Sequence, residues 1–389
     1  MSAEIAFWLA VATLGYTWVG YPVLLGAIAL FVPAPRRGLS APPRLSVIIA
    51  AYNEERWIEP KLTSTLQQRY PHERLEVIVV SDGSTDRTDA LVARCADPRV
   101  RLIRQEPRAG KSAALNRGAA AATGDVLVFT DANALFAPDA LARLAASFAD
   151  PHVGLVSGQG LYRATSDGDT RAVGNGYVRY EALVRSGESA LGILATADGA
   201  IYALRRQLFQ PLHPADVNDF LHPMQAALAG YRSRFDPNAY TIEPASAGGG
   251  GELRRHVRIT AQGIHLLQRW LPHLVAARRW RVVWAVLSHR VLRWASAFFL
   301  VTAFVANLAL LQPGGFYHLT LAAQLGFYGL ALVGFFGERA GLRLGRLAIP
   351  YYFCIVSAAG VGGLARYLRR GAEAVWAPRG QATARDRAA

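Results

Sequence analysis

The sequence is poor in cysteine and in charge of either sign. Its two cysteines, Cys95 and Cys354, lie far apart, which excludes a disulfide framework and a cysteine-based metal site. Only 18% of the residues are charged, whereas 52% are hydrophobic, a balance that favours membrane segments over one soluble domain. At 389 residues the chain has room for two or three domains.

Lysine is almost absent, and the net charge of +14 comes almost entirely from arginine. A basic surplus suits nucleic acid, anionic lipid headgroups or an anionic substrate. The sequence has no zinc-ligand spacing, no helix-turn-helix pattern and no aromatic-rich basic strand, so nucleic acid is not an expected partner. Lipid headgroups and a phosphate-bearing substrate explain the charge better.

The first long stretch without a charged residue runs from Ile5 to Val32. About 20 apolar residues span the core of a bilayer, so this stretch predicts a membrane-spanning helix. A cleaved signal peptide is the alternative, but the run is too long and lacks a basic start. Arg36 and Arg37 follow it, and basic residues at this end place the next domain in the cytoplasm.

The C-terminal part of the chain is also apolar. Three stretches have spanning length, namely Trp294 to Leu311, Phe316 to Phe336 and Leu347 to Ala365. Before them, arginines alternate with Trp and Leu in residues 254–284, which predicts helices in the membrane interface that are interrupted at Pro272. Gly248 to Gly251 predict a flexible linker. Four crossings would leave the basic tail after Ala365 outside, so either one stretch is re-entrant or the tail breaks the positive-inside rule.

Three short runs rich in Val and Ile begin at Leu45, Leu75 and Val126, and each ends in polar residues. Runs of this length bounded by turn residues are typical of buried parallel strands. In an open α/β sheet the ligand binds outside the carboxyl ends of the strands. The polar residues after the three runs should therefore line one crevice.

Asp82 and Lys111 are candidate ligand contacts. Asp82 follows the second run, and its carboxylate could accept a hydrogen bond from N3–H of uracil, although a helix-capping run is the simpler interpretation. Lys111 is one of only two lysines, follows Gly110 and opens a predicted helix, where an ammonium group can meet a phosphate. A solvated surface lysine is the alternative, and the spacing of a P-loop is missing.

Asp131 and Asn133 follow the third run. Residues two apart on an extended chain point the same way, so both side-chain oxygens can face one cation. Mg²⁺ and Mn²⁺ prefer oxygen ligands and keep part of their coordination shell for substrate phosphates. An Asp-x-Asn is otherwise a common turn; after a buried strand we favour the metal site.

Together these motifs resemble the family 2 glycosyltransferases, and in particular their membrane-embedded branch. The segments Ala-Tyr-Asn-Glu, Ser-Asp-Gly-Ser-Thr-Asp, Gly-Lys-Ser-x-x-Leu-Asn and Thr-Asp-Ala-Asn occur in this order between Leu45 and Gly230. That branch includes the cellulose, hyaluronan, poly-N-acetylglucosamine and Nod-factor chito-oligosaccharide synthases. The resemblance implies an α/β GT-A (Rossmann-like) fold, a nucleotide-sugar donor and inversion at the anomeric carbon.

The resemblance also implies roles for particular residues. Contacts to the base and ribose of a uridine nucleotide would come from Ala50, Tyr52, Glu54 and Asp82, and Lys111 would lie near the diphosphate. Asp131 matches the first Asp of the Asp-x-Asp metal motif, which binds Mg²⁺ or Mn²⁺, and Asn133 replaces the second. Asp219 matches the catalytic base, eleven residues before Gly230, and Asn218 replaces the usual Glu before it.

The acceptor side departs from the family pattern. Processive members carry Gln-x-x-Arg-Trp, whereas this chain has Gln262 followed by Gly-Ile-His-Leu, and a displaced Gln-Arg-Trp that ends at Trp270. Asp198, Gln262 and Trp270 are the candidate acceptor contacts.

The predicted organisation has five parts. They are an N-terminal transmembrane helix (1–35), a GT-A domain (36–247), a linker with interfacial helices (248–290), three transmembrane segments (291–367) and a basic tail (368–389). The predicted function is extension of a polysaccharide from a nucleotide-sugar at the cytoplasmic face of the inner membrane, with export through the protein's own helices. Transfer of one sugar to a lipid-linked or glycolipid acceptor is the first alternative, and a binding or transport subunit without catalysis is the second.

Overall fold

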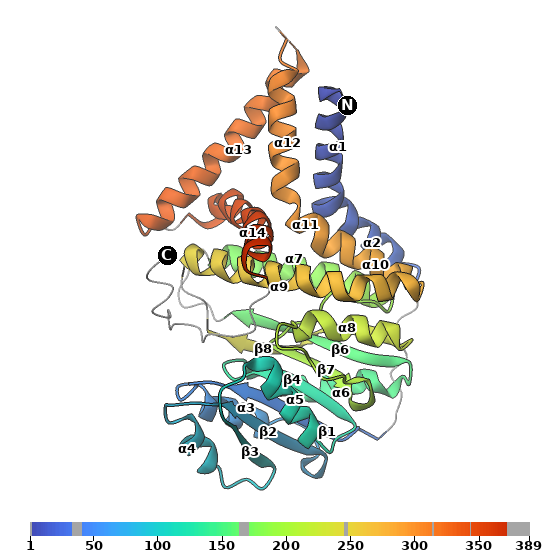
Figure 1. The fold of residues 1–389 in the computed structure, drawn as a ribbon, viewed down its shortest axis with the longest axis vertical. Coiled ribbons are helices and arrows are strands. Elements are labelled where there is room, and N and C mark those ends of the chain that lie inside the picture. The colour runs from blue at the N-terminus through green and yellow to red at the C-terminus, as the bar shows by residue number, and fades with distance from the viewer. Residues whose placement is uncertain are drawn as a thin grey trace.

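The computed structural model describes residues 2–32, 41–162, 171–244, 248–312, 315–342 and 344–371. Residues 372–389 of the basic tail and the linker arginines Arg36 and Arg37 lie outside these ranges, whereas residues 368–370 of the tail form the end of a helix. An α/β domain forms one end of the molecule and a group of long helices forms the other, with a horizontal layer of helices between them (Figure 1).

One mixed sheet of eight strands organises the α/β domain, in the order β3-β2-β1-β4-β7-β6-β8-β5. The strands are β1 (Leu45–Ala51), β2 (Leu75–Asp82), β3 (Val100–Gln105), β4 (Val126–Asp131), β5 (Leu135–Phe136), β6 (Val153–Tyr162), β7 (Ile201–Arg205) and β8 (Arg232–Glu243). β1 pairs in parallel with β2 and β4, and β2 pairs in parallel with β3. β7 runs antiparallel to β4 and joins this parallel half to the rest of the sheet.

Both faces of the parallel half are buried, which explains the uninterrupted Val and Ile runs. Ile48 and Ile78 belong to one apolar core, whereas their neighbours Val47 and Val77 belong to another on the opposite face. The helices packed in and around these cores are α3 (Ile58–Leu66), α4 (Thr88–Ala93), α5 (Lys111–Ala121), α6 (Ala140–Ala146), α7 (Arg171–Ala190) and α8 (Asn218–Leu228).

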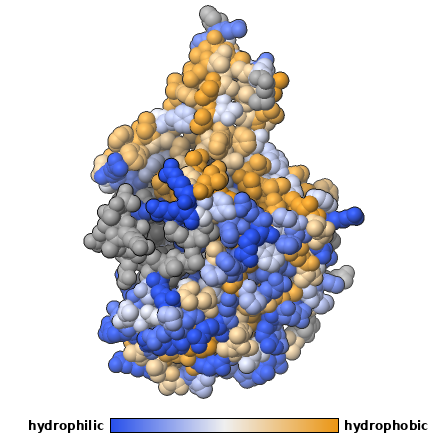
Figure 2. Space-filling view, viewed as in Figure 1, coloured by the Kyte–Doolittle hydropathy of each residue, from blue (hydrophilic) through white to orange (hydrophobic). Residues whose placement is uncertain are grey.

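Eight further helices make up the rest of the described chain. They are α1 (Ala3–Gly15), α2 (Tyr21–Ala29), α9 (Gly248–Ala276), α10 (Trp280–Val286), α11 (Leu292–Trp294), α12 (Ser296–Ala309), α13 (Phe316–Arg339) and α14 (Ile349–Arg370). Three helical stretches in the described residues are long and apolar enough to cross a membrane: Ala3–Ala29, Phe316–Arg339 and Gly345–Arg370. Hydrophobic residues cover this end of the molecule, whereas the α/β domain is mostly hydrophilic (Figure 2).

The structure refines one prediction for the C-terminal part and contradicts another. The predicted stretch from Trp294 to Leu311 corresponds mostly to α12, and a bend of 58° separates Ser296–Ala309 from the preceding Trp280–Trp294. If this bent pair is one span, the described residues hold four candidate spans. Gly248 to Gly251 form the first turn of α9 instead of a linker.

Helix α9 also continues through Pro272 to Ala276, so the predicted interruption is wrong. Packing overrides local preference here, since α14 lies along α9 with its backbone close enough that a Cβ at Gly363 would be 2.5 Å from Thr260. Small residues at such a contact let two helix backbones approach closely.

Candidate active site

The ends of β2 and β4 lie on either side of β1, as the sequence predicts. Ala50 on β1 is in register with Val80 on β2 and with Asp131 on β4. Asp82 ends β2 and Asp131 ends β4, so the two carboxylates lie at one edge of the sheet, two strands or about 10 Å apart. That span suits an extended ligand such as a nucleotide.

Asp82 is buried and holds the loop that precedes α5. Its carboxylate accepts hydrogen bonds from Gln105 Nε2 at 2.6 Å, from Ala109 N at 2.8 Å and from Gly110 N at 2.9 Å. Gly110 has φ +94°, a conformation that favours glycine. Asp82 therefore fixes the start of α5 and with it the position of Lys111.

Tyr52 and Arg108 form a flat surface beside Asp82. The Arg108 guanidinium lies 3.6 Å from the centroid of the Tyr52 ring, and its Nε lies 3.6 Å from Asp82 Oδ2. The loop around Tyr52 is tied to the loop after β2, because Glu54 N donates to Thr88 Oγ1 at 2.8 Å. Aromatic and guanidinium planes of this kind stack on nucleobases.

Lys111 Nζ forms an ion pair with Asp131 Oδ1 at 2.6 Å. The other lysine, Lys61, is fully buried under the same loop, and its ammonium group donates to Thr130 Oγ1 at 2.8 Å and to the carbonyl of Ala134. Burial lowers the pKa of Lys61 well below its usual value, although Asp131 opposes the shift. Both lysines of the chain thus lie within electrostatic reach of Asp131.

The donor set at Asp131 and Asn133 fits a divalent cation in part. Both side chains offer oxygen, and Asn133 is buried. The described residues contain no group of three or more His, Cys, Asp or Glu side chains that could hold a metal ion. The protein would therefore supply few ligands, and substrate phosphates and water would complete the shell, which is the usual arrangement for Mg²⁺.

Asp219 lies in the first turn of α8, and contacts from the sheet fix the position of that turn. Asn218 Nδ2 donates to the Tyr202 hydroxyl at 2.6 Å, and Ala197 N donates to the Asp219 carbonyl at 2.8 Å. Gly199 packs directly against the carboxylate, since a Cβ there would lie 3.1 Å from Asp219 Oδ2.

The electrostatic surroundings of Asp219 tie it to the strand-end residues. Burial raises the pKa of the Asp219 carboxyl. Lys111 and Arg290 oppose this rise, whereas Asp198 and Asp131 add to it. Asp219 therefore lies within electrostatic reach of the Lys111–Asp131 pair, and a carboxylate with a raised pKa is suited to accept a proton near neutral pH.

Comparison with known proteins agrees with this geometry. Residues 46–208 match the family described as Glycosyl transferase family 2. The chain carries a family 2 glycosyltransferase domain. Its fold is the GT-A arrangement expected from the sequence.

Three similar proteins illustrate the likeness. An N-acetylglucosaminyltransferase of Sinorhizobium fredii is 31% identical over 62% of this chain and 63% of its own length. The poly-beta-1,6-N-acetyl-D-glucosamine synthase of Staphylococcus aureus is 27% identical over 57% of this chain and 54% of its own length. The solved structure of the mannosyltransferase PcManGT from Pyrobaculum calidifontis, in complex with GDP-Man and Mn²⁺, is 28% identical.

The structural match to the mannosyltransferase covers almost the whole of both chains, whereas the sequence matches to the two curated relatives cover only part of each chain. The mannosyltransferase matches with a TM-score of 0.65 over 92% of this chain and 99% of the solved one. The chain spans less than two thirds of the two curated relatives, at 63% and 54% of their lengths.

The three candidate acceptor residues have different environments. Asp198 lies beside Asp219 and forms an ion pair with Arg185 at 2.9 Å. Trp270 is partly buried and packs against the apolar core under α9 and beside His273. Gln262 lies on α9, one turn before Leu266 in that core.

Four residues of the site were not predicted: Lys61, Arg108, Arg185 and Arg290. Only Lys61 carries a signal in the sequence, because lysine is so rare in this chain. The three arginines are indistinguishable among many others until the fold brings them together.

Proposed function

We propose that this protein transfers a sugar from a nucleotide-sugar to an acceptor hydroxyl at a membrane surface, with inversion at C1. The observation that carries the proposal is that Asp219 packs against Gly199, just before β7, whose Ile201 is in register with Thr130 at the end of β4, where Lys111 pairs with Asp131. Lys111 suits a diphosphate, and Asp219 offers a carboxylate base.

In the proposed reaction Asp219 accepts the proton of the acceptor hydroxyl as its oxygen attacks C1 of the sugar. The bond between C1 and the diphosphate oxygen breaks, and the nucleoside diphosphate leaves. Lys111 offsets the charge that develops on the diphosphate, and a single displacement inverts C1.

Asp131 and Asn133 would hold a divalent cation beside the diphosphate. Such a cation, Mg²⁺ or Mn²⁺, would neutralise phosphate charge when bound. The Mn²⁺ in the complex of the similar mannosyltransferase supports this assignment.

Tyr52, Glu54, Asp82 and the backbone at Ala50 would bind the nucleoside. A uridine nucleotide is the expectation from sequence. The GDP-Man bound to the similar mannosyltransferase makes a guanosine nucleotide a second candidate.

Two acceptors have support. The name of the Staphylococcus aureus relative supports extension of a polysaccharide. The packing of the partly buried Trp270 against the apolar core favours a single transfer to a lipid-linked acceptor.

The test is to incubate the purified protein in lipid nanodiscs with labelled UDP-GlcNAc or GDP-Man and with total membrane lipids. The proposal predicts label in a product of one sugar or many, and loss of that product when chelator removes divalent cations. A protein that neither hydrolyses nor transfers any of the common nucleotide-sugars would contradict the proposal.

A further inference from the structure

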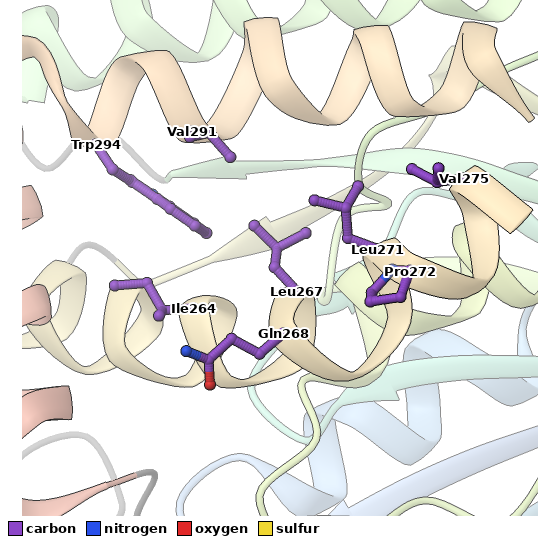
Figure 3. Close-up of a pocket in the computed structure, with 8 residues that line it drawn as sticks. All are labelled: Ile264, Leu267, Gln268, Leu271, Pro272, Val275, Val291 and Trp294. Atoms are coloured by element: carbon purple, nitrogen blue, oxygen red, sulfur yellow. The ribbon is translucent and has the colours of Figure 1, made fainter.

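An apolar groove of about 480 Å³ lies between α9 and the bent helical pair that follows it. Leu267 and Leu271 extend from α9 toward Val291 and Trp294 on the other side (Figure 3). Its volume lies within the range of roughly 300–1,000 Å³ that is typical of small-molecule sites.

The lining of the groove is almost entirely apolar. Gln268 is its one polar side chain, and the Tyr367 hydroxyl on α14 donates to the Gln268 carbonyl oxygen. Val275 at one end is 39% exposed, so the groove is open to its surroundings. Water solvates such a surface poorly, and an alkyl or isoprenoid chain would release that water.

The groove is continuous with the region that carries the candidate membrane spans. Trp294 ends the first arm of the bent pair, and α12 begins two residues later at Ser296. A lipid chain could therefore enter the groove from a bilayer. Helices that lie at the membrane interface bury their apolar faces about 5–10 Å into the headgroup region.

Trp294, which lines the groove, contacts the residue that follows the proposed base. The ring of Trp294 meets the ring of Phe220 edge-on, with centroids 6.1 Å apart. Gly263 makes room for this contact, because a Cβ there would lie 2.5 Å from Trp294 Cη2. Phe220 follows Asp219 in α8, so a chain in the groove would place its head at Asp219.

Arg290 adds a positive charge at this junction. Arg290 precedes Val291, which lines the groove, and its guanidinium carbon lies 6.0 Å from the centroid of the Phe220 ring. Its positive charge lowers the pKa of Asp219. Within the described ranges no carboxylate lies within ion-pair distance of Arg290, so a bound anionic group would be its first such partner. A phosphate between the lipid chain and the accepting hydroxyl fits this position.

We propose that the groove binds the hydrocarbon chain of a membrane lipid whose phosphate lies near Arg290 and whose sugar or alcohol hydroxyl is the acceptor. This inference rests on the proposed function and specifies its acceptor. The lining residues Ile264 and Leu271 set the preference for a long chain, and Arg290 sets the preference for a phosphate.

The test uses the full chain in detergent with GlcNAc phosphate esters that carry methyl, decyl or hexadecyl chains, and with UDP-GlcNAc or GDP-Man as donor. The inference predicts that KM for the ester falls by about 100-fold from methyl to hexadecyl, since each buried methylene contributes to affinity. An uncharged hexadecyl glycoside tests the phosphate: Arg290→Gln should abolish the preference for the phosphate ester over this glycoside.

Leu271→Trp fills the groove and should reduce the ratio of methyl to hexadecyl KM at least tenfold. Leu325→Trp, at an exposed site on α13, is the matched control and should keep the wild-type ratio. Transfer that ignores chain length, or a Leu271→Trp ratio equal to that of the control, would overturn the groove assignment while leaving the proposed function intact. Absence of both transfer and donor hydrolysis would overturn both.

Discussion

The donor side and the acceptor side of the site are built in different ways. On the donor side, Asp82 and Asp131 end the two parallel strands on either side of β1, and short hydrogen bonds fix each loop. On the acceptor side, Asp219, Arg290 and Trp294 come from helices whose contacts are mostly apolar. The donor side therefore follows from local sequence, whereas the acceptor side depends on how distant helices pack.

This difference has a chemical counterpart. The donor side concentrates charge, with both lysines of the chain near Asp131. The acceptor side places a carboxylate with a raised pKa next to an apolar groove. A charged diphosphate and an amphiphilic acceptor would thus enter from opposite sides.

Among the donor-side variants, Asp131→Ala should give the largest loss of activity. It removes the carboxylate that pairs with Lys111 and would hold the cation, so we expect kcat/KM to fall about 10²–10³-fold. The measurement is initial rate against donor concentration, with and without Mn²⁺. Asp139→Ala, at a surface ion pair with Arg143, is the control. If Asp131→Ala responds to Mn²⁺ as the wild-type protein does, Asp131 is not a ligand of the cation.

Asp82→Ala should act mainly on donor affinity. The carboxylate holds the Gln105 to Gly110 loop and would bind the nucleoside, so donor KM should rise about 10–100-fold while acceptor KM is unchanged. Asp97→Ala, which removes a partly buried pair with Arg99 away from the site, should leave both constants unchanged. An equal rise in donor KM and acceptor KM would contradict the proposal that the donor side and the acceptor side act separately.

Lys61→Met tests whether a buried charge serves the donor side or the fold. Lys61 Nζ donates to Thr130 Oγ1 and to the Ala134 carbonyl, and a buried acceptor that loses its donor costs about 1–3 kcal/mol, so Tm should fall by a few degrees. Donor KM should rise several-fold, since a positive charge near Asp131 is lost. A large drop in Tm with unchanged KM would show that Lys61 is only structural.

With an uncharged acceptor glycoside, Arg290→Gln should give the smallest effect, a shift in pH dependence. The positive charge of Arg290 lowers the pKa of Asp219, so its removal raises that pKa. Because the base must be deprotonated, the acidic limb of the kcat/KM profile should move to higher pH. Arg117→Gln, at an exposed site on α5, should leave the profile in place. If the acidic limb of the Arg290→Gln profile stays in place or moves to lower pH, Arg290 does not lower the pKa of Asp219.

The limits of sequence reasoning follow the same division. The strands that carry Asp82 and Asp131 were predictable because their residues are buried on both faces. β3 was missed because Arg101 and Arg104 interrupt its apolar pattern at the exposed edge of the sheet. The helical state of Gly248 to Gly251 and the groove at Trp294 depend on packing between α9, α14 and the bent pair, which no local pattern encodes.

The central claim is that one site binds the donor through the strand ends and activates the acceptor through Asp219. Asp219→Asn, with Asp236→Asn on β8 as the control, tests it most directly when donor Kd and transfer rate are measured on the same protein. The account predicts an unchanged donor Kd and a transfer rate lower by about 10²–10⁴-fold. Near-normal transfer by Asp219→Asn, or a loss of donor binding that accounts for the whole defect, would contradict it.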